Sequence, residues 1–218
     1  TGDASDFGNL TNAKTGAPAG VSNSTRGLFC GGGDPTQDTI EYITMASTGD
    51  AVDFGNLLAA MKHGMSASST TRGVIAGGLA PTITNVIQYV ITATLGNAAD
   101  FGDLTTATRG GGVGSASNAV RGIFTGGYAP TVTNVMEYIT MASAGNAGDF
   151  GDLTTAVSMP GATASPTRMI TAGGGTPSPV VNVITYVQIA TIGNSVDFGD
   201  LTLAREQPAG CSNGHGGL

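Results

Sequence analysis

The sequence lacks several features that mark common classes of protein. It contains no Trp, only two His and two Cys, and only 11% of its 218 residues are charged. Eight Lys and Arg stand against 15 Asp and Glu, for a formal net charge of −7. A nucleic-acid-binding surface needs clustered basic residues to neutralise phosphates. The composition therefore argues against DNA, RNA and anionic membrane surfaces as partners.

Signals for membrane insertion, secretion and catalysis are also scarce. No apolar run approaches the roughly 18 residues of a membrane-spanning helix, and the first residues, TGDASDFGNL, lack the basic and apolar regions of a signal peptide. His63 and His215 lie far apart in loop-like surroundings, so neither a zinc site nor a nucleophile–histidine pair is indicated. We therefore expect no enzymatic activity. Cys30 and Cys211 occupy different positions in the sequence pattern and are predicted to be small buried thiols.

An internal repeat is the dominant feature that is present. The tripeptide Asp-Phe-Gly occurs five times, with spacings of 47, 47, 49 and 48 residues. A second marker is an Arg before an apolar strand, and a third is a Tyr within an apolar stretch. The Asp-Phe pairs are Asp6 and Phe7, Asp53 and Phe54, Asp100 and Phe101, Asp149 and Phe150, and Asp197 and Phe198. The other two markers are Arg26, Arg72, Arg121 and Arg168, and Tyr42, Tyr89, Tyr138 and Tyr186.

Each period is predicted to form four short β-strands. In the third period the segments are GGVGSAS, RGIFTGG, NVMEYITM and AGDFGDLT, in which β-branched and aromatic residues are bounded by Gly, Pro, Asn and Asp. No segment shows a sustained period of 3.6, so we expect very little helix. Four strands in a period near 48 are typical of a β-propeller blade.

The whole chain resembles the kelch repeat. The segment RGIFTGGYAPTVTNVMEY shows the Gly-Gly doublet that closes the second strand and the Tyr of the third strand. The departure lies in the fourth strand, where kelch repeats usually carry a Trp and this chain carries the Phe of Asp-Phe-Gly. The resemblance implies an all-β propeller of kelch-like four-stranded blades.

We predict one domain, residues 1–218, with a split fifth blade. The complete blades are expected at about 17–57, 64–104, 112–153 and 160–201, and the split blade at 1–10 with 206–218. Aligning AGCSNGHGGL with AGVSNSTRGL places His215 where Thr25 stands. Propellers remove open sheet edges by completing one blade from both chain ends. An incomplete ring, or one completed by upstream sequence or another subunit, is the alternative.

The amino-acid sequence of the repeat shows a second resemblance. The pattern of TRG, EYIT and GNA-x-DFGDLT is similar to repeats in virion structural and tail-fibre-like proteins of marine bacteriophages, particularly cyanophages. This resemblance implies a virion or extracellular location, other virion proteins as partners, and a host-surface glycan or receptor as ligand. It also implies a homo-oligomer held together by a missing upstream region.

The repeated Asp-Phe-Gly is predicted to be a structural device. A protein kinase has one copy, together with a His-Arg-Asp loop and a strand lysine, and this chain has five copies in other surroundings. The alternative is a Ca²⁺ site, because segments such as GNAADFGDL gather carboxylates near a Gly. We expect instead that each Asp caps backbone amides or holds an Arg of its own or the adjacent blade, and that Phe fills the space between blades. No cofactor is predicted.

Binding is expected on the loops between the second and third strands, because these loops vary most and loops on a rigid scaffold commonly carry function. Tyr128, Asp34 and Gln37 are the candidate binding residues there. The sequence thus predicts a non-enzymatic virion module that displays a receptor- or glycan-binding surface. The alternatives are a secreted or cell-surface carbohydrate-binding propeller unrelated to a virion, and a catalytic propeller such as a sugar oxidase or lyase.

Overall fold

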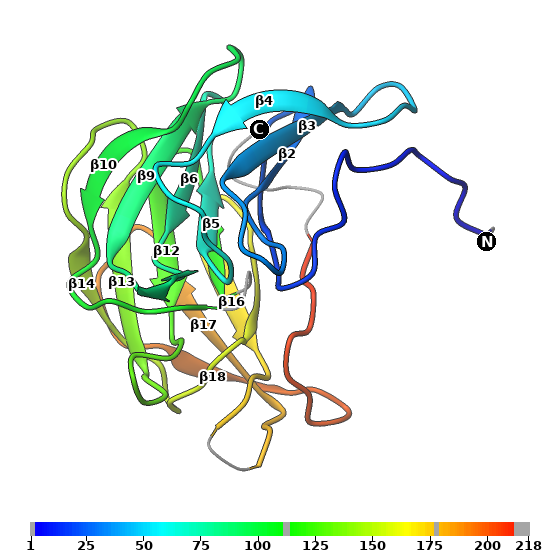
Figure 1. Cartoon of the computed structure of the whole chain (residues 1–218). Helices are drawn as coiled ribbons and strands as arrows, with labels where there is room; N and C mark the ends of the chain where they lie inside the picture. Colours follow the sequence, from blue (N-terminus) through cyan, green and yellow to red (C-terminus); the bar gives the residue numbers. More distant parts are fainter. Residues whose placement is uncertain (1–2, 111–113, 177–178, 212–218) are drawn as a thin grey trace.

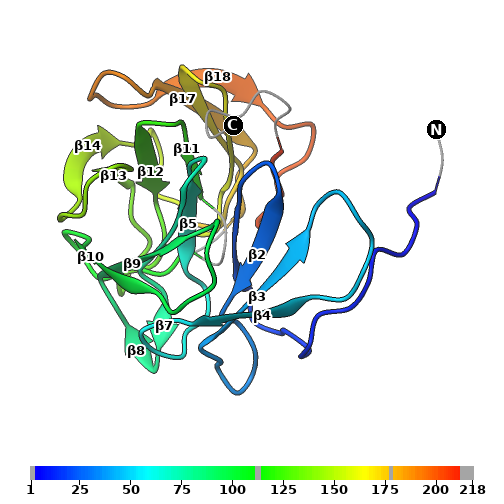
Figure 2. The ribbon, with the colours of Figure 1, turned by 90° about the horizontal axis from the view of Figure 1, so that it is seen from above.

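The computed structural model describes residues 3–110, 114–176 and 179–211, and these residues form strands, turns and loops without any helix (Figure 1). Four sheets each contain four antiparallel strands in sequence order. Seen from above, the sheets are arranged around a common axis as the blades of a propeller (Figure 2). The all-β propeller fold predicted from the sequence is therefore confirmed.

Each blade takes its strands from one period of the repeat. Blade 1 consists of β1 (Ala19–Ser22), β2 (Arg26–Cys30), β3 (Thr39–Thr44) and β4 (Val52–Asn56). Blade 2 consists of β5 (Met65–Ser68), β6 (Arg72–Ala76), β9 (Val86–Ile91) and β10 (Ala99–Asp103). Blade 3 consists of β11 (Ser115–Ser117), β12 (Arg121–Thr125), β13 (Val135–Thr140) and β14 (Gly148–Asp152). Blade 4 consists of β15 (Gly161–Ala164), β16 (Arg168–Ala172), β17 (Val183–Gln188) and β18 (Val196–Asp200). A small ribbon, β7 (Leu79–Ala80) with β8 (Thr82–Ile83), extends the loop between β6 and β9.

In each of the four blades, the Phe of Asp-Phe-Gly is the extra residue of a β-bulge. In blade 2, Asp100 pairs with Gln88 and Gly102 pairs with Ile87, so Phe101 has no partner of its own in the ladder. The same register shift occurs in the outer strands of the other three blades. A bulge bends the strand and redirects a side chain. Here it sends Phe101 into the space between blades, where its side chain is only 2% exposed.

The hydrophobic core lies between the blades. Three apolar clusters each combine residues of two neighbouring blades, and each contains one of the buried rings Phe54, Phe101 and Phe150. Each of these rings meets the third-strand Tyr of its own blade edge to face, with centroids 5.8–6.0 Å apart. Full burial of one such ring contributes about 1.5–3 kcal/mol, so these contacts hold adjacent blades together.

A repeated set of three hydrogen bonds, which we call the junction clamp, joins adjacent blades at their outer strands. Between blades 2 and 3, the amide of Gly145 donates to the carbonyl of Phe101 (2.6 Å), and the amide of Ala147 donates to that of Asp103 (2.8 Å). The amide of Asp103 donates in return to Asn146 Oδ1 (3.0 Å). The same three bonds join blades 1 and 2 and blades 3 and 4.

The N-terminal segment clamps blade 1 in the same way. The amides of Gly49 and Ala51 donate to the carbonyls of Phe7 (2.7 Å) and Asn9 (2.8 Å), and the amide of Asn9 donates to Asp50 Oδ1 (2.8 Å). Residues 6–9 therefore take the position that the outer strand of a preceding blade would take.

The other end of the chain reaches the fifth inner position. The amide of Gln207 donates to the carbonyl of Met159 (3.0 Å), as the amide of His63 does to that of Ala17 (3.1 Å). Gly210 and Cys211 then line the central channel together with the innermost strands of all four blades. The predicted remainder of the split blade, residues 212–218 with His215, lies outside the described residues.

The expected pairing of Arg with the Asp of Asp-Phe-Gly is wrong. All five Asp side chains are exposed at the outer edge of the ring, where Asp6 and Asp149 accept the amide of the Gly two residues later. Each second-strand Arg instead stacks on the Tyr of its own blade, with its guanidinium carbon 4.5–4.8 Å from the ring centroid. Arg26, Arg72 and Arg121 also donate to a main-chain carbonyl of the next blade at 2.9–3.0 Å. An aromatic face satisfies the cation at a lower desolvation cost than a buried ion pair.

The cysteines differ from each other. Cys30 is buried, as predicted, whereas Cys211 is exposed, and both are free thiols. Burial raises the pKa of the Cys30 thiol to about 12, slightly offset by the charge of Lys14. Among the described residues, no helix is long and apolar enough to cross a membrane.

Candidate functional site

The candidate site is the face of the ring on which two sets of loops meet. One set connects the second and third strands of each blade, and the other carries the chain from an outer strand to the next inner strand. Main-chain bridges join the two sets: Lys62 pairs with Leu79, Arg109 with Tyr128, and Ser158 with Gly175. This face is rigidly framed, and its side chains differ from blade to blade.

The channel opens onto this face through a ring of turn residues. They precede the inner strands at matching positions, and the non-glycine members have positive φ angles of 45–62°. These positions are Ala17, His63, Gly110, Met159 and Gln207. A left-handed turn brings the chain from the outside of one blade to the inner strand of the next, so these residues lie at the end of the inner strands that line the channel.

Four residues on one side of the mouth form what we call the mouth cluster: Lys62, His63, Arg109 and Tyr128. The guanidinium carbon of Arg109 lies 4.9 Å from the centroid of the Tyr128 ring. The amide of Gly110 donates to the carbonyl of His63 (3.0 Å), which fixes the Arg109 turn beside the His63 turn. Three of the ten Lys, Arg and His residues of an acidic chain are thus gathered in two adjacent turns.

The mouth cluster is poorly neutralised. Burial lowers the pKa of His63 below its usual value, and the nearby charges of Arg109 and Lys62 lower it further. Lys62 Nζ lies 4.0 Å from Asp34 Oδ1, but that carboxylate is 78% exposed, so the pair is weak. His63 Nδ1 and Arg109 Nε are buried atoms that lack a hydrogen-bond partner within the described structure. Such atoms are rare in folded proteins and can be satisfied by a ligand.

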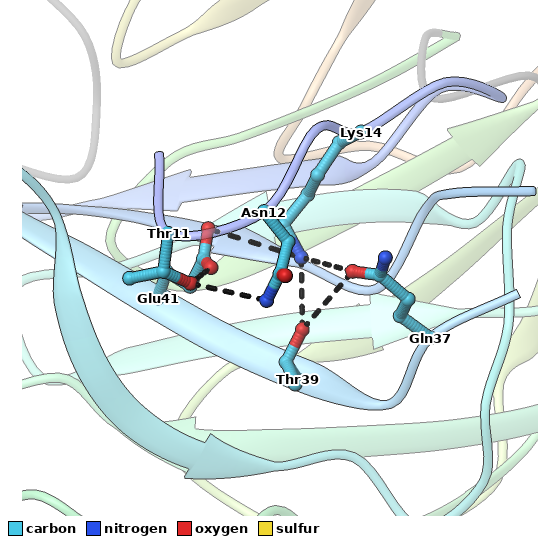
Figure 3. A network of polar contacts seen from close by, with 6 residues as sticks. All are labelled: Thr11, Asn12, Lys14, Gln37, Thr39 and Glu41. Atoms are coloured by element: carbon cyan, nitrogen blue, oxygen red, sulfur yellow. Dashed lines mark hydrogen bonds and ion pairs between the residues drawn. The ribbon is translucent and has the colours of Figure 1, made fainter. Parts of the chain in front are cut away.

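The three predicted binding residues all lie on this face, in different situations. Tyr128 is half-buried, and Arg109 stacks on its ring, so that face of the ring is not free to contact a ligand. Asp34 is exposed. Gln37 is engaged in a polar network, because Lys14 Nζ donates to its Oε1 at 3.2 Å (Figure 3). Of the three residues, only Asp34 is exposed.

The network around Gln37 is structural. Lys14 Nζ lies 3.9 Å from Glu41 Oε2, and both side chains are 1% exposed. Lys14 also donates to the Thr39 hydroxyl (2.9 Å), and the Thr11 hydroxyl donates to Glu41 Oε1 (Figure 3). Burying both charges is costly unless they are paired and hydrogen-bonded. The network supplies hydrogen bonds to Lys14 Nζ and Glu41 Oε1, whereas Glu41 Oε2 has only its ion pair with Lys14 within the described structure. Its effect is to hold the N-terminal segment against blade 1.

The channel itself is lined by small hydroxyl and methyl groups. Its volume is about 240 Å³. The hydroxyl of Ser115 accepts the amide of Ser66 (2.8 Å) and donates to the carbonyl of the same residue (2.6 Å). Ser117 binds Ser68 in the same way. These hydroxyls therefore join inner strands of adjacent blades, and the channel wall carries no charged side chain among the lining residues.

The structure offers no support for the calcium alternative in the part of the chain that it describes. No three His, Cys, Asp or Glu side chains lie close enough together there to hold a metal ion. The Asp residues of Asp-Phe-Gly are instead spread around the outer edge of the ring, one in each of the four blades and one, Asp6, in the N-terminal segment. Two of them, Asp6 and Asp149, already accept a backbone amide through a carboxylate oxygen.

The sequence pattern did not predict that three basic side chains would cluster, namely those of Lys62, His63 and Arg109. Lys62 and Arg109 look like members of a regular basic position, and His63 is an isolated histidine in a loop. The available signal was the break in the repeat: the five mouth positions carry Ala, His, Gly, Met and Gln, whereas structural positions keep one residue type. This variation within an otherwise strict repeat is the feature that could have drawn attention to the cluster.

Comparison with solved structures supports the fold. The chain is similar to the structure of YjhT, a kelch-type propeller, with a TM-score of 0.72 over 88% of this chain and 72% of that chain. The two sequences are 10% identical, so the similarity concerns the fold alone. No family model matches the chain, and no curated protein matches it by sequence.

Proposed function

We propose that the chain is a non-enzymatic propeller module of a bacteriophage virion, which displays a host-receptor or glycan-binding face. The observation that carries the proposal is the location of the positions at which the residue differs from blade to blade. Residues that recur in every blade are used in junction clamps, Tyr–Phe contacts and Arg–Tyr stacks. Lys62, His63 and Arg109, by contrast, come together in turns whose residues differ from blade to blade.

The mouth cluster favours an acidic ligand, such as the carboxylate or sulfate of an acidic saccharide. Its cations have one weak carboxylate partner, and a buried Arg109 nitrogen lacks an acceptor within the described structure. Arg binds planar anions through two parallel hydrogen bonds, and these charge-assisted bonds are among the strongest polar contacts. The proposed virion setting rests on the resemblance of the repeat sequence to repeats in marine phage structural proteins.

A glycan array that includes neutral, uronic-acid and sulfated sugars tests the binding face. Arg109→Met should weaken binding to an acidic sugar by about tenfold, as expected for the loss of a charge-assisted hydrogen bond. The matched control is Arg205→Met, because Arg205 is exposed and its side chain donates only to the carbonyl of Leu203 in the described structure. Equal losses in the two variants would show that net charge, not the mouth cluster, binds the sugar.

NMR titration of His63 gives an independent readout. A bound anion should raise the pKa of His63, because it opposes the lowering by burial, Arg109 and Lys62.

Immuno-electron microscopy of phage particles tests the virion setting. Sugar binding without any particle carrying the chain would favour a secreted or cell-surface carbohydrate-binding propeller. If the chain is found in phage particles but binds neither sugars nor host cells, its function would be to decorate the particle.

A further inference from the structure

A cavity of about 170 Å³ lies between blades 2 and 3. The loop between β12 and β13 and the segment that follows β10 form its walls, and Glu137 of β13 is the only charged residue among the described residues that line it. Glu137 is 4% exposed. The amide and the hydroxyl of Thr105 both donate to Glu137 Oε1, whereas Oε2 accepts no hydrogen bond within the described structure and is reachable from the cavity. A carboxylate oxygen in such surroundings calls for a partner.

Blade 1 has the same carboxylate with a cation already beside it. Glu41 pairs across the sheet with the Asp of Asp-Phe-Gly in its own blade, as Glu137 does, so the two glutamates hold equivalent positions. Lys14 Nζ lies 3.9 Å from Glu41 Oε2 and donates to the Thr39 hydroxyl (2.9 Å) and to Gln37 Oε1 (3.2 Å) (Figure 3). At this position the fold therefore holds an ammonium group between one carboxylate and two neutral oxygens.

The side chain opposite this third-strand position differs from blade to blade. It stands eight residues after the Asp of the preceding Asp-Phe-Gly. In blade order, the pairs are Lys14 with Glu41, Met61 with Gln88, Thr108 with Glu137, and Val157 with Thr185. In blade 2 the Gln amide donates to the Met sulfur at 3.3 Å, and in blade 4 the Val and the Thr line a cavity of only about 10 Å³. Of these four pairs, only that of blade 3 combines a carboxylate with a short, uncharged partner, and there the space stays open.

We propose that the cavity between blades 2 and 3 binds a primary ammonium group, with Glu137 as its counter-ion. An ammonium group has three donors and no acceptor. The hydroxyls of Thr108 and Thr133 line the cavity as neutral acceptors, and Phe124 and Val132 offer apolar contacts to the carbon skeleton of the ligand. The cavity is smaller than the roughly 300–1,000 Å³ pockets of drug-sized ligands. It therefore takes one amine-bearing unit, an amino sugar or an alkyl amine.

This site is independent of the proposed function of the mouth cluster, because the two attract ligands of opposite charge. Burial raises the pKa of Glu137, the hydrogen bonds from Thr105 oppose this shift in part, and the charge of Asp149 adds to it. A cation beside a carboxyl favours its ionised form. A bound ammonium group and the ionised Glu137 therefore stabilise each other.

NMR titration of the full chain with three small molecules, at neutral pH and constant ionic strength, tests the site. Glucosamine and N-acetylglucosamine share the sugar ring, but only glucosamine carries an ammonium group, and n-butylamine carries the ammonium group without the ring. We expect saturable shifts of the Thr108 and Glu137 amides with an amine and none with N-acetylglucosamine. The amine that binds more tightly identifies the source of the ammonium group.

Glu137→Gln is the first test variant. Gln88 occupies the same position in blade 2, where its Oε1 accepts the Leu58 amide at 2.8 Å, so a Gln fits here. The substitution should weaken amine binding by about tenfold or more, as expected for the loss of a charge-assisted hydrogen bond. The matched control is Asp200→Asn, which removes an exposed carboxylate of blade 4 and should leave the affinity unchanged.

Thr108→Lys is the second variant, and it copies the arrangement of Lys14 in blade 1. The new side chain should supply the ammonium group from within the chain, so that added amines no longer bind and the melting temperature rises. The rise should disappear when Thr108→Lys is combined with Glu137→Gln. This comparison needs no added ligand.

Four outcomes would overturn the proposal. They are no saturation with either amine up to about 100 mM, equal binding of N-acetylglucosamine and glucosamine, equal losses in Glu137→Gln and Asp200→Asn, and unchanged amine binding in Thr108→Lys. The mouth cluster is tested with acidic sugars and Arg109→Met. Failure of one proposal is therefore distinguishable from failure of the other.

Discussion

The junction between blades 2 and 3 and the β18 edge of blade 4 contain the same Asp-Phe-Gly motif. They differ in the residues that pack against the Phe of that motif. Phe101 lies against Ile139, Met141 and Ala147 of the next blade and is 2% exposed. Phe198 has the same bulge and the same Tyr contact, but no described third strand faces it, and it is 53% exposed. One sequence motif therefore makes a core residue or a surface residue according to whether a neighbouring blade is present.

The largest expected difference between the two regions concerns the Phe rings. Phe101→Ala should lower the free energy of unfolding by about 3–5 kcal/mol, because it leaves a cavity between two blades. Phe198→Ala should cost less than about 1 kcal/mol, because its ring is half in solvent. Chemical denaturation of both variants measures this. Equal losses would show that the two environments are alike in solution.

The two glycines of one clamp give the next largest difference. Gly102 has a φ of +143°, and a Cβ there would lie 2.5 Å from the backbone of Gly145. Gly102→Ala should cost about 2–4 kcal/mol from backbone strain and overpacking combined. Gly145→Ala is the matched control, since its Cβ would meet nothing within 4 Å, and it should change stability by less than about 1 kcal/mol. A cost at Gly145 as large as that at Gly102 would contradict the close approach of the two backbones.

A smaller, pH-dependent effect is expected at Glu137, which joins blade 3 to blade 2. Burial raises the pKa of Glu137, and hydrogen bonds from the Thr105 hydroxyl and amide oppose the shift only in part. A carboxyl whose folded pKa is raised stabilises the fold at pH below its unfolded pKa, and this contribution is lost as the pH rises through the folded pKa. Blade 2 carries Gln88 at the same position, where it accepts the Leu58 amide at 2.8 Å.

Glu137→Gln should therefore gain stability relative to the native chain as the pH is raised through this window. Thermal melts from about pH 4 to pH 8 measure the difference, and they span the range in which a Glu with a raised pKa titrates. The control is Gln88→Glu, which should produce the opposite slope. A pH-independent difference would mean that the pKa of Glu137 is not shifted.

The smallest expected difference concerns the reactivity of the two cysteine thiols, one buried in blade 1 and one exposed beside the channel. Cys30 is buried in blade 1 with a pKa of about 12, whereas Cys211 is exposed beside the channel. Because the thiolate is the reactive form, a thiol reagent at about pH 8 should modify Cys211 quickly and Cys30 only after unfolding. One fast equivalent, abolished by Cys211→Ser, is the expected result. Two fast equivalents would show that the core of blade 1 opens.

Much of the fold was available from the sequence because its signals are local. The four-strand period and the positions of the strands depend on short-range alternation and on glycine. The loops that differ from blade to blade could also be located, since they vary where the rest of the repeat does not. The partners of charged side chains could not, because they depend on distances between blades: the expected Arg–Asp pairs gave way to Arg–Tyr stacks and exposed carboxylates.

The sequence by itself determined that this protein is a ring of repeated four-stranded sheets, because a strict period of markers favours one packing of equivalent units. Tertiary structure alone decided which copies of each motif are buried, which cations remain without a full partner, and that the mouth cluster assembles from two turns 46 residues apart. The physical reason is that burial and electrostatic pairing are properties of neighbours in space. A motif such as Asp-Phe-Gly specifies the bulge of its own strand, and the adjacent blade decides whether its Phe is buried.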